Sequence, residues 1–470
     1  MQNTSFRQEA YINGAWETST KTFPVTNPAS GQVLAQVPDL GTEAFEKAVQ
    51  AAQAAFKPWA ALLPKERGAY LKKWSALIAE NAESLAQLLT SEQGKPIEES
   101  RNEVNGAAGT VEWFAEEARR NYGEIVPPPR ENLRLEVQYV PLGVVAAITP
   151  WNFPVSMVTR KVAPAIAAGC TVVLKPSEET PLCALALASL AEKAGIPKGV
   201  VNVVTAGAAG AAAFGQLMCS HTLVRKISFT GSTAVGRILM QQAGAQIKKV
   251  GLELGGNAPF IIFASADLEK AVEGLIANKF RNAGQTCICA NRIFVEKGAE
   301  GKIIKLLEEK LKEANIGPLI NKEAKEKVEE LLADSQKHGA KAVTVSRNNG
   351  EGLYCNPVIL TGVPVQARIF REEIFGPVAP IYSFESEDEV IVAANDTEYG
   401  LAAYIYSGDL AQGQRIMAGL DYGMVGFNQV PLAYEGVPFG GMKQSGIGRE
   451  GGHWGMKEFM EIKYLAIETR

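Results

Sequence analysis

The stretch that decides the fold runs from residue 143 to residue 175, GVVAAITPWNFPVSMVTRKVAPAIAAGCTVVLK. Two short runs rich in β-branched and apolar residues, Gly143–Ile148 and Thr171–Leu174, flank a segment of helical length, Pro154–Ala168. A strand, a helix and a second strand in this order form a βαβ unit, in which the two strands lie parallel. The segment therefore predicts a parallel sheet that is covered by helices.

The same alternation continues on both sides of Glu253. Before it, strands are expected at Val200–Val204 and Lys226–Phe229, with helices at Pro181–Ala194 and Thr233–Gln242. After it, a second alternating series is expected to include Pro259–Phe263, Asp267–Phe280, Ile293–Glu296, Ala342–Val345, Val378–Tyr382, Glu387–Ala394 and Leu401–Tyr406. The sequence thus predicts an α/β protein with two doubly wound domains.

The flanking segments differ from this pattern. Asn13-Gly14 indicates a hairpin within Tyr11–Trp16, and Thr42–Arg120 has the apolar spacing of successive helices. Leu133–Tyr139 and Phe459–Ala466 alternate between apolar and polar residues and could pair with each other. Since neither has enough sheet of its own, we expect the pairing to join subunits of a homodimer or homotetramer. The expected boundaries are 1–120 and 140–252, 253–452, and 121–139 with 453–470.

Composition excludes several classes of protein. The 470 residues are 46% hydrophobic and 21% charged, which is typical of a globular protein of two or more domains. The formal net charge of −4 makes nucleic acid an unexpected partner. The longest apolar stretch, Ala163–Leu174, is too short to span a membrane, and the polar N-terminal residues carry no signal-like segment. We therefore expect a cytoplasmic enzyme.

The cysteines and histidines argue against a metal site. The six cysteines form no C-x-x-C pair, and the three histidines lie far apart in the sequence. Cys287, in Gly284-Gln285-Thr286-Cys287, follows an amphipathic helix on a glycine-containing turn, where a thiol can face a cleft as a nucleophile. A free cysteine can also be a small buried hydrophobe.

Other polar residues stand where parallel strands end. Glu253 ends an apolar strand and precedes Gly255-Gly256-Asn257, so it is a candidate base or a cap of the next turn. Asn152, between two prolines, is a candidate hydrogen-bond donor or the N-cap of the next helix. Gly231–Gly236 opens a helix and could bind an anion. Lys175 and Glu178 could bind a ribose or belong to a solvated loop.

Seven motifs together resemble the aldehyde dehydrogenase superfamily and occur in its order. They are TPWNFP (149–154), KPSE (175–178), FTGST (229–233), LELGG (252–256), FRNAGQTC (280–287), EEIFGPV (372–378) and PFGGMKQSGIGRE (438–450). Among the subfamilies, the chain is most similar to succinate semialdehyde dehydrogenases, through GQTCICANR (284–292), TRK (159–161) and Arg281. The resemblance implies a Rossmann-type cofactor domain, a catalytic domain and a small β extension for oligomerisation.

The resemblance also implies a mechanism. Cys287 would attack the aldehyde carbon, and the Asn152 side chain with the Cys287 backbone N–H would hold the oxyanion. Glu253 would then activate the water that hydrolyses the thioester. Lys161 and Glu450 would carry the proton towards solvent, unless they form only a structural ion pair.

The implied cofactor is NAD, with NADP tolerated. A Glu178 carboxylate would accept a hydrogen bond from the ribose 2′-hydroxyl and repel a 2′-phosphate, whereas Lys175 and Ser177 could admit some NADP. The expected cofactor-binding residues are Trp151, Lys175, Ser177, Glu178, Gly231, Ser232, Gly236, Leu254, Glu373 and Phe375.

The implied substrate is an aldehyde with a distal carboxylate. Arg160 and Arg281 would bind that carboxylate beside Phe153, although either arginine could instead lie at the surface or in an ion pair. Succinic semialdehyde is the first candidate, and 2-oxoglutaric semialdehyde, glutaric semialdehyde and betaine aldehyde are alternatives. The stretch Gln429–Val437 departs from the pattern of succinate semialdehyde dehydrogenases. A non-catalytic member of the fold and a cysteine hydrolase or transferase are further alternatives.

Cys289 follows the nucleophile by two residues, a spacing that also occurs in succinate semialdehyde dehydrogenases whose catalytic loop can form a disulfide. A Cys287 thiol of low pKa would oxidise to a sulfenic acid, which Cys289 could capture. The alternative is a packed, inert thiol.

Overall fold

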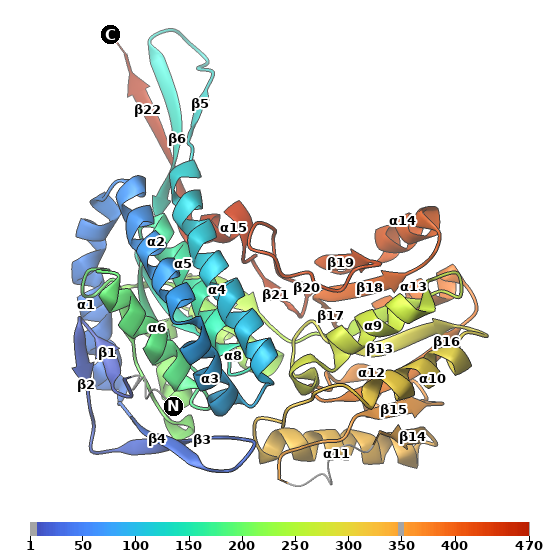
Figure 1. The fold of residues 1–470 in the computed structure, drawn as a ribbon. Helices are drawn as coiled ribbons and strands as arrows, with labels where there is room; N and C mark the ends of the chain where they lie inside the picture. Colours follow the sequence, from blue (N-terminus) through green and yellow to red (C-terminus); the bar gives the residue numbers. More distant parts are fainter. Residues whose placement is uncertain (1–6, 346–351, 470) are drawn as a thin grey trace.

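Two open sheets with helices on their faces form the two bodies of the protein (Figure 1). The structure, a computed structural model, describes residues 7–345 and 352–469. In spatial order the first sheet contains β2 (Ala15–Glu17), β1 (Ala10–Ile12), β9 (Val201–Val203), β8 (Thr171–Lys175), β7 (Val144–Ile148), β10 (Val224–Thr230), β11 (Lys249–Glu253) and β21 (Gly446–Ile447). The five strands from β9 to β11 are parallel, which confirms the predicted βαβ units.

The order of these five strands reverses between β7 and β10. If the five strands are numbered along the chain, their order in the sheet is 3-2-1-4-5. β8 and β9 lie on one side of β7, whereas β10 and β11 lie on its other side. Where the strand order reverses, the connections after the two central strands diverge and leave a crevice at their carboxyl ends. The turn after Ile148 and the turn after Thr230 therefore border one crevice.

The second sheet is parallel except at one edge. Its strands, in spatial order, are β14 (Lys341–Thr344), β15 (Val358–Thr361), β16 (Val378–Phe384), β13 (Ala290–Glu296), β12 (Ala258–Ile262), β18 (Ala402–Tyr406) and β19 (Met424–Phe427). Among the described strands of this sheet, only β14 runs antiparallel to its neighbour. Residues 254–257 connect the carboxyl end of β11 to the amino end of β12. The carboxyl end of the first sheet and the amino end of the second sheet therefore lie close together at this connection.

Helices cover both sheets. Those of the first body are α1 (Thr42–Ala61), α2 (Pro64–Glu80), α3 (Ala82–Gln93), α4 (Ile97–Glu117), α5 (Pro154–Ala168), α6 (Pro181–Lys193), α7 (Ala211–Ser220), α8 (Thr233–Gly244) and α15 (Gly452–Lys457). Those of the second are α9 (Leu268–Lys279), α10 (Glu300–Leu311), α11 (Lys322–Lys337), α12 (Arg368–Arg371), α13 (Glu387–Asn395) and α14 (Leu410–Gly419). In the described part of the chain, no helix has both the length and the apolar character needed to cross a bilayer.

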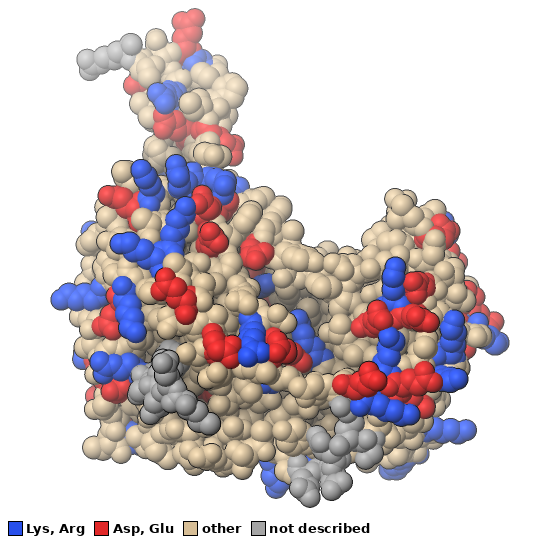
Figure 2. All heavy atoms as spheres, viewed as in Figure 1, with Lys and Arg blue, Asp and Glu red and all other residues tan. Residues whose placement is uncertain are grey.

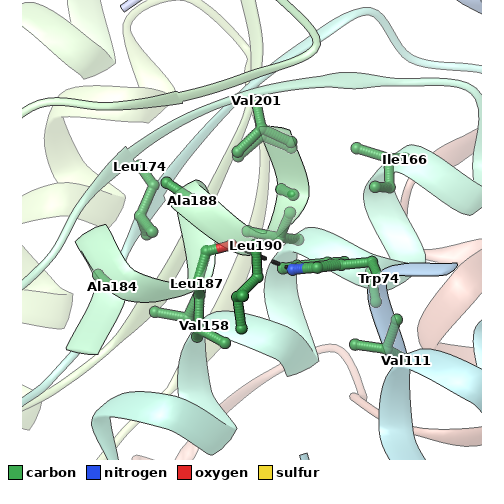
Figure 3. Close-up of a cluster of buried hydrophobic side chains, with 14 of the residues drawn as sticks. Trp74, Val111, Val158, Ile166, Leu174, Ala184, Leu187, Ala188, Leu190 and Val201 are labelled. Atoms are coloured by element: carbon green, nitrogen blue, oxygen red, sulfur yellow. Dashed lines mark hydrogen bonds between the residues drawn. The ribbon is translucent and has the colours of Figure 1, made fainter. Parts of the chain in front are cut away.

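The core of the first body holds α5 firmly. The Trp74 indole of α2 packs among side chains of α4, α5 and α6, and its Nε1 donates a 3.1 Å hydrogen bond to the Leu187 carbonyl oxygen (Figure 3). Val158 and Ile166 of α5 are buried in the same cluster. Because buried side chains interdigitate at high density, the start of α5 is a rigid support for the TPWNFP turn before it.

A three-stranded sheet projects from the first body (Figure 1). Its strands are β5 (Glu124–Val126), β6 (Leu133–Pro141) and β22 (Met460–Glu468), and β22 pairs antiparallel with β6 along its whole length. The predicted pairing of the two long segments is confirmed, but the expectation that they pair across subunits is wrong, because the C-terminal strand returns beside β6 of its own chain. β5 and β22 remain as free edges of this arm among the described residues.

Two small sheets complete the fold. They pair β3 (Thr22–Thr26) with β4 (Val33–Pro38), and β17 (Tyr399–Gly400) with β20 (Met442–Lys443). The predicted hairpin is also confirmed, since Tyr11 pairs with Trp16 and both turn residues, Asn13 and Gly14, have positive φ.

Candidate active site

Two cavities meet at Cys287. Figure 2 shows that the surface of the molecule is hollowed between its two bodies. One cavity has a volume of about 370 Å³ and the other about 240 Å³. Cys287, Phe153 and Met157 line both, so the thiol can be approached from two directions. None of the three histidines lines either cavity. A cysteine hydrolase or transferase, which normally pairs its thiol with a histidine, would therefore lack that histidine here.

The loop before Cys287 has an unusual backbone. A 3-10 turn, Arg281–Gly284, follows α9, and Asn282, Ala283 and Gly284 all have φ between 50° and 77°. A Cβ at Gly284 would lie 2.3 Å from the Gly376 carbonyl oxygen, so only glycine fits there. This left-handed path brings the thiol to the amino end of β13.

Burial suppresses ionisation of the Cys287 thiol. Its pKa is raised to about 12, first by desolvation and then by the carboxyls of Glu373 and Glu253, whereas Arg160 opposes the shift. The expectation of a low pKa is therefore wrong for this site: two nearby carboxyls and a low-polarity environment outweigh one guanidinium.

Glu253 is the last residue of β11 and is only 5% exposed. Its Oε2 is buried without a hydrogen-bond partner among the described residues, which does not fit a carboxylate that caps a turn or helix. Burial, and then the nearby Glu450, raise its pKa well above the ordinary value for a glutamic acid. Lys161 bonds Glu450 at 2.8 Å and Ser228 Oγ at 3.3 Å. The two glutamic acids and the lysine thus form one cluster beside the thiol.

Asn152 connects the TPWNFP turn to the loop of Cys287. The N-cap of α5 is Phe153, so the alternative of Asn152 as helix cap is wrong. Its side-chain Nδ2 donates to the Gln285 carbonyl oxygen at 3.0 Å. Its own carbonyl oxygen accepts from Lys95 Nζ at 2.7 Å and from Asn282 Nδ2 at 3.0 Å. Asn152 is therefore held at both its side chain and its backbone.

The larger cavity contains most of the predicted cofactor residues. Its lining includes Trp151, Gly231, Ser232, Leu254, Glu373 and Phe375. The other four lie outside its lining: Lys175 pairs with Glu178 at 3.3 Å, Ser177 Oγ accepts from the Glu179 N–H, and Gly236 lies in α8. Lys175 is only 4% exposed, which does not fit a freely solvated loop.

The groups that line this cavity fit a dinucleotide. Gly231 and Ser232 precede α8, whose amino end favours phosphate, and the nearby Thr230 hydroxyl is buried without a partner among the described residues. At the other end, Trp151 and Phe375 meet edge to face at 5.5 Å. Glu373 accepts a bond from the Gly256 N–H at 2.9 Å, and burial raises its pKa to about 7.

Sequence reasoning missed one wall of this cavity. Glu323, Ala324 and Lys327 of α11 also line it. The sequence of α11, KEAKEKVEELLADSQK, is that of a charged helix, and nothing in this pattern indicates which turn faces a ligand.

The smaller cavity contains the three predicted substrate residues. The Arg160 guanidinium lies 4.8 Å from the Phe439 ring centre, and its NH1 is buried without a partner among the described residues. Arg281 is exposed and lies 5.1 Å from the Phe153 ring centre. In the described part of the chain neither arginine forms an ion pair, so the structural ion-pair alternative is wrong for both. Arg160 is half-buried, whereas the exposure of Arg281 also fits the alternative of a surface residue.

The remaining lining of this cavity was not predicted. Glu99, Glu103 and Glu435 bring three carboxyls to it, and Ala433 comes from the departing stretch Gln429–Val437. The Glu103 carboxylate pairs with Lys95 and accepts hydrogen bonds from two N–H groups of α5, whereas Glu435 forms no ion pair among the described residues.

Cys289 lies apart from both cavities. It is 1% exposed, its Sγ lies 3.3 Å from Lys279 Nζ, and no disulfide joins it to another cysteine of the described residues. Capture of an oxidised Cys287 by Cys289 stays a prediction. A tight turn, in which the Cys289 N–H donates to the Thr286 carbonyl oxygen at 3.1 Å, joins the two cysteines.

Comparison with known proteins agrees with this geometry. The profile of the aldehyde dehydrogenase family matches residues 16–465. The 3-sulfolactaldehyde dehydrogenase of Pseudomonas putida is 50% identical over 98% of this chain and 97% of its own length. The NADP-dependent succinate-semialdehyde dehydrogenase of Escherichia coli is 50% identical over 98% of both chains. The crystal structure of succinate-semialdehyde dehydrogenase from Burkholderia pseudomallei covers both chains completely, with a TM-score of 0.97 and 47% identity. By fold and by sequence, the chain belongs to the aldehyde dehydrogenase family of oxidoreductases.

Proposed function

We propose that the protein oxidises an anionic aldehyde, with succinic semialdehyde or a related ω-carboxy aldehyde as the substrate. The observation that carries the proposal is Arg160, which lines the cavity beside Cys287 and whose buried NH1 has no partner among the described residues. Two relatives at 50% identity are named for sulfolactaldehyde and succinate semialdehyde, and both of these aldehydes carry an anionic group. A guanidinium suits either a carboxylate or a sulfonate.

The thiol of Cys287 attacks the carbonyl carbon and forms a thiohemiacetal. The oxygen that gains negative charge is stabilised by the Asn152 side-chain amide and the Cys287 backbone N–H, and one such donor contributes about 2.7–4 kcal/mol. Because the pKa of the thiol is raised to about 12, its proton must leave as the bond forms. Glu253, whose carboxyl lies close enough to raise that pKa, is the base for this transfer.

NAD(P)⁺ bound in the larger cavity would accept the hydride from the thiohemiacetal carbon. Trp151 and Phe375 would flank its nicotinamide, Glu373 its ribose, and Ser232 and Gly231 its pyrophosphate. Glu178, paired with Lys175 beyond that cavity, would bind the adenine ribose and favour NAD over NADP. An excess of kcat/KM with NADP over NAD would contradict this preference.

Glu253 first releases the thiol proton towards solvent through Lys161 and Glu450, and then acts a second time in hydrolysis. It takes a proton from the water that attacks the thioester, and Lys161 with Glu450 passes that proton towards solvent. Glu450 is suited to the outer position because its side chain is 12% exposed, whereas that of Lys161 is 1% exposed. The product is the carboxylic acid.

We also propose the assignment of domains. Residues 1–120 and 140–252 form the cofactor domain, 253–452 form the catalytic domain, and 121–139 with 453–470 form an arm for a homodimer or homotetramer. Two C-terminal elements cross these boundaries, because β21 pairs with β11 in the first sheet and α15 packs against α4 and α5. The exposed Ile125, Ile462 and Tyr464 of the arm support its role in assembly. Removal of the residues after Gly455 should abolish assembly, and a truncated protein that sediments as the intact oligomer would contradict the assignment.

A panel of aldehydes tests the substrate. NADH formation should be fastest with succinic semialdehyde or another ω-carboxy aldehyde, compared with betaine aldehyde and alkanals of similar length. No NADH with any aldehyde would indicate a non-catalytic member of the family, and a preference for betaine aldehyde would refute the proposed role of Arg160.

A further inference from the structure

A buried lysine outside both cavities contacts the backbone of the oxyanion donor. Lys95 lies between α3 and α4, is 1% exposed and lines neither cavity. Its Nζ donates to the Asn152 carbonyl oxygen at 2.7 Å and lies 3.8 Å from the centre of the Phe153 ring. A charged donor at this distance forms one of the stronger hydrogen bonds in a protein.

The partner of Lys95 extends the same contact to α5. Glu103 bonds Lys95 Nζ at 2.5 Å through Oε2, and its Oε1 accepts the N–H groups of Val155 at 2.9 Å and Ser156 at 3.1 Å. These are among the first N–H groups of α5, which have no acceptor within the helix. The Lys95–Glu103 pair therefore holds the turn on both sides of Asn152, at its carbonyl oxygen and at the helix that follows.

The loop of the nucleophile is tied to the same point. Asn282 Nδ2 also donates to the Asn152 carbonyl oxygen, and Asn282 Oδ1 accepts from Gln93 Nε2 at 2.8 Å. Gln93 Oε1 in turn accepts from the Lys95 N–H at 3.0 Å. The segment Gln93–Lys95 thus joins the donor loop to the nucleophile loop.

We propose that Lys95 is a positioning residue that aims the Asn152 amide at the oxyanion. The inference rests on the proposed role of Asn152 as the oxyanion donor. A donor stabilises the transition state only if it is held at hydrogen-bond distance from the forming oxyanion before the reaction. Without the Lys95 ammonium, the Asn152 carbonyl loses its charged partner and the turn from Pro150 to Phe153 gains freedom to move.

A double-mutant cycle with Asn152→Ala tests this role. The acylation rate is measured as the pre-steady-state burst of NADH with succinic semialdehyde. Asn152→Ala should slow the burst by about 10²- to 10³-fold, and Lys95→Met should slow it by at least about 10-fold with a much smaller change in substrate KM. If Lys95 acts through Asn152, adding Lys95→Met to Asn152→Ala should cost less than about threefold more.

Two further variants keep the test decisive if Lys95→Met is unstable. Lys95→Met with Glu103→Gln leaves no unpaired buried charge and should still slow the burst by at least about 10-fold. Lys226 is a matched control, because it is also 1% exposed, pairs with Glu458 at 3.0 Å and lies 5.2 Å from the Phe459 ring centre. Lys226→Met should lower the melting temperature comparably but leave the burst rate within about twofold of wild type.

The outcomes separate the two proposals. Lys95→Met could slow the burst equally in the wild-type and Asn152→Ala backgrounds while Asn152→Ala itself is slow. That result would overturn the positioning role of Lys95 but not the role of Asn152 as oxyanion donor. A wild-type burst rate in the Lys95→Met/Glu103→Gln variant would also overturn the positioning role. The slow burst of Lys95→Met would then come from the unpaired, buried Glu103 carboxylate. An unchanged burst in Asn152→Ala would instead overturn the proposed oxyanion donor.

Discussion

Replacement of Arg160 by methionine should change which aldehydes the enzyme prefers. Methionine keeps most of the length of the side chain and its contact with Phe439, but it removes the buried NH1 that has no partner among the described residues. A hydrogen bond to a charged group contributes about 1.5–3 kcal/mol. The loss of one such bond should lower kcat/KM for succinic semialdehyde by about 10- to 150-fold.

The informative quantity is the ratio of kcat/KM for succinic semialdehyde to that for butanal. Arg160 also lowers the pKa of Cys287, so its removal should slow both substrates through the nucleophile. That common effect cancels in the ratio, which leaves only the contact with the carboxylate. A ratio equal to that of wild type would refute the reasoning.

Arg281 provides a graded comparison. It lines the same cavity but is exposed, and solvent screens an exposed ion pair to about 0.2–1 kcal/mol. Arg281→Met should therefore change the ratio by less than about fivefold. Arg237, which pairs with Glu398 and lines neither cavity, should leave the ratio unchanged when it is replaced in the same way.

Four further outcomes are expected. Glu253→Gln should slow the burst of NADH and lower steady-state turnover by about 10²- to 10⁴-fold, because Glu253 is the proposed base in both steps, and an unchanged burst would contradict its role in deprotonating Cys287. Because the pKa values of Cys287 and Glu253 are both raised, their ionised forms gain as pH rises, so kcat/KM should increase from about pH 6 to about pH 9, whereas a flat profile would oppose this cause. Glu178→Ser should raise the NADP-to-NAD ratio of kcat/KM by at least about tenfold, measured with both cofactors. After peroxide and then dithiothreitol, wild type should recover activity and Cys289→Ala should not; equal recovery would make Cys289 a packing residue.

The sequence predicts the elements of the first body well because local and tertiary preferences agree there. The runs at 144–148 and 171–175 are buried on both faces, and such strands are continuously apolar.

The partner of each arm strand could not be predicted in the same way. The alternation in β6 and β22 correctly indicates two strands with unlike faces, but alternation does not reveal whether the partner strand belongs to the same chain.

The ionisation of the site could not be predicted from the motifs. A motif shows that Cys287 and Glu253 are present, whereas their pKa values depend on burial and on carboxyls that are distant in sequence, such as Glu373 and Glu450. The wall formed by α11 was missed for a related reason. Its cavity-lining Glu323 and Lys327 look like any other solvated pair on a charged helix.

The glycines of the motifs have a steric reason that only the fold reveals. A Cβ at Gly256 would lie 2.3 Å from the Cys287 carbonyl oxygen, so the connection between the two sheets passes directly against the backbone of the nucleophile. This close approach leaves the thiol between the two cavities, with the proposed base, Glu253, at the end of β11 and the proposed oxyanion donor, Asn152, on another turn. A larger residue at 256 would push the Cys287 backbone away, and since the backbone N–H of Cys287 is a proposed oxyanion donor, such a change should slow acylation more than it weakens cofactor binding.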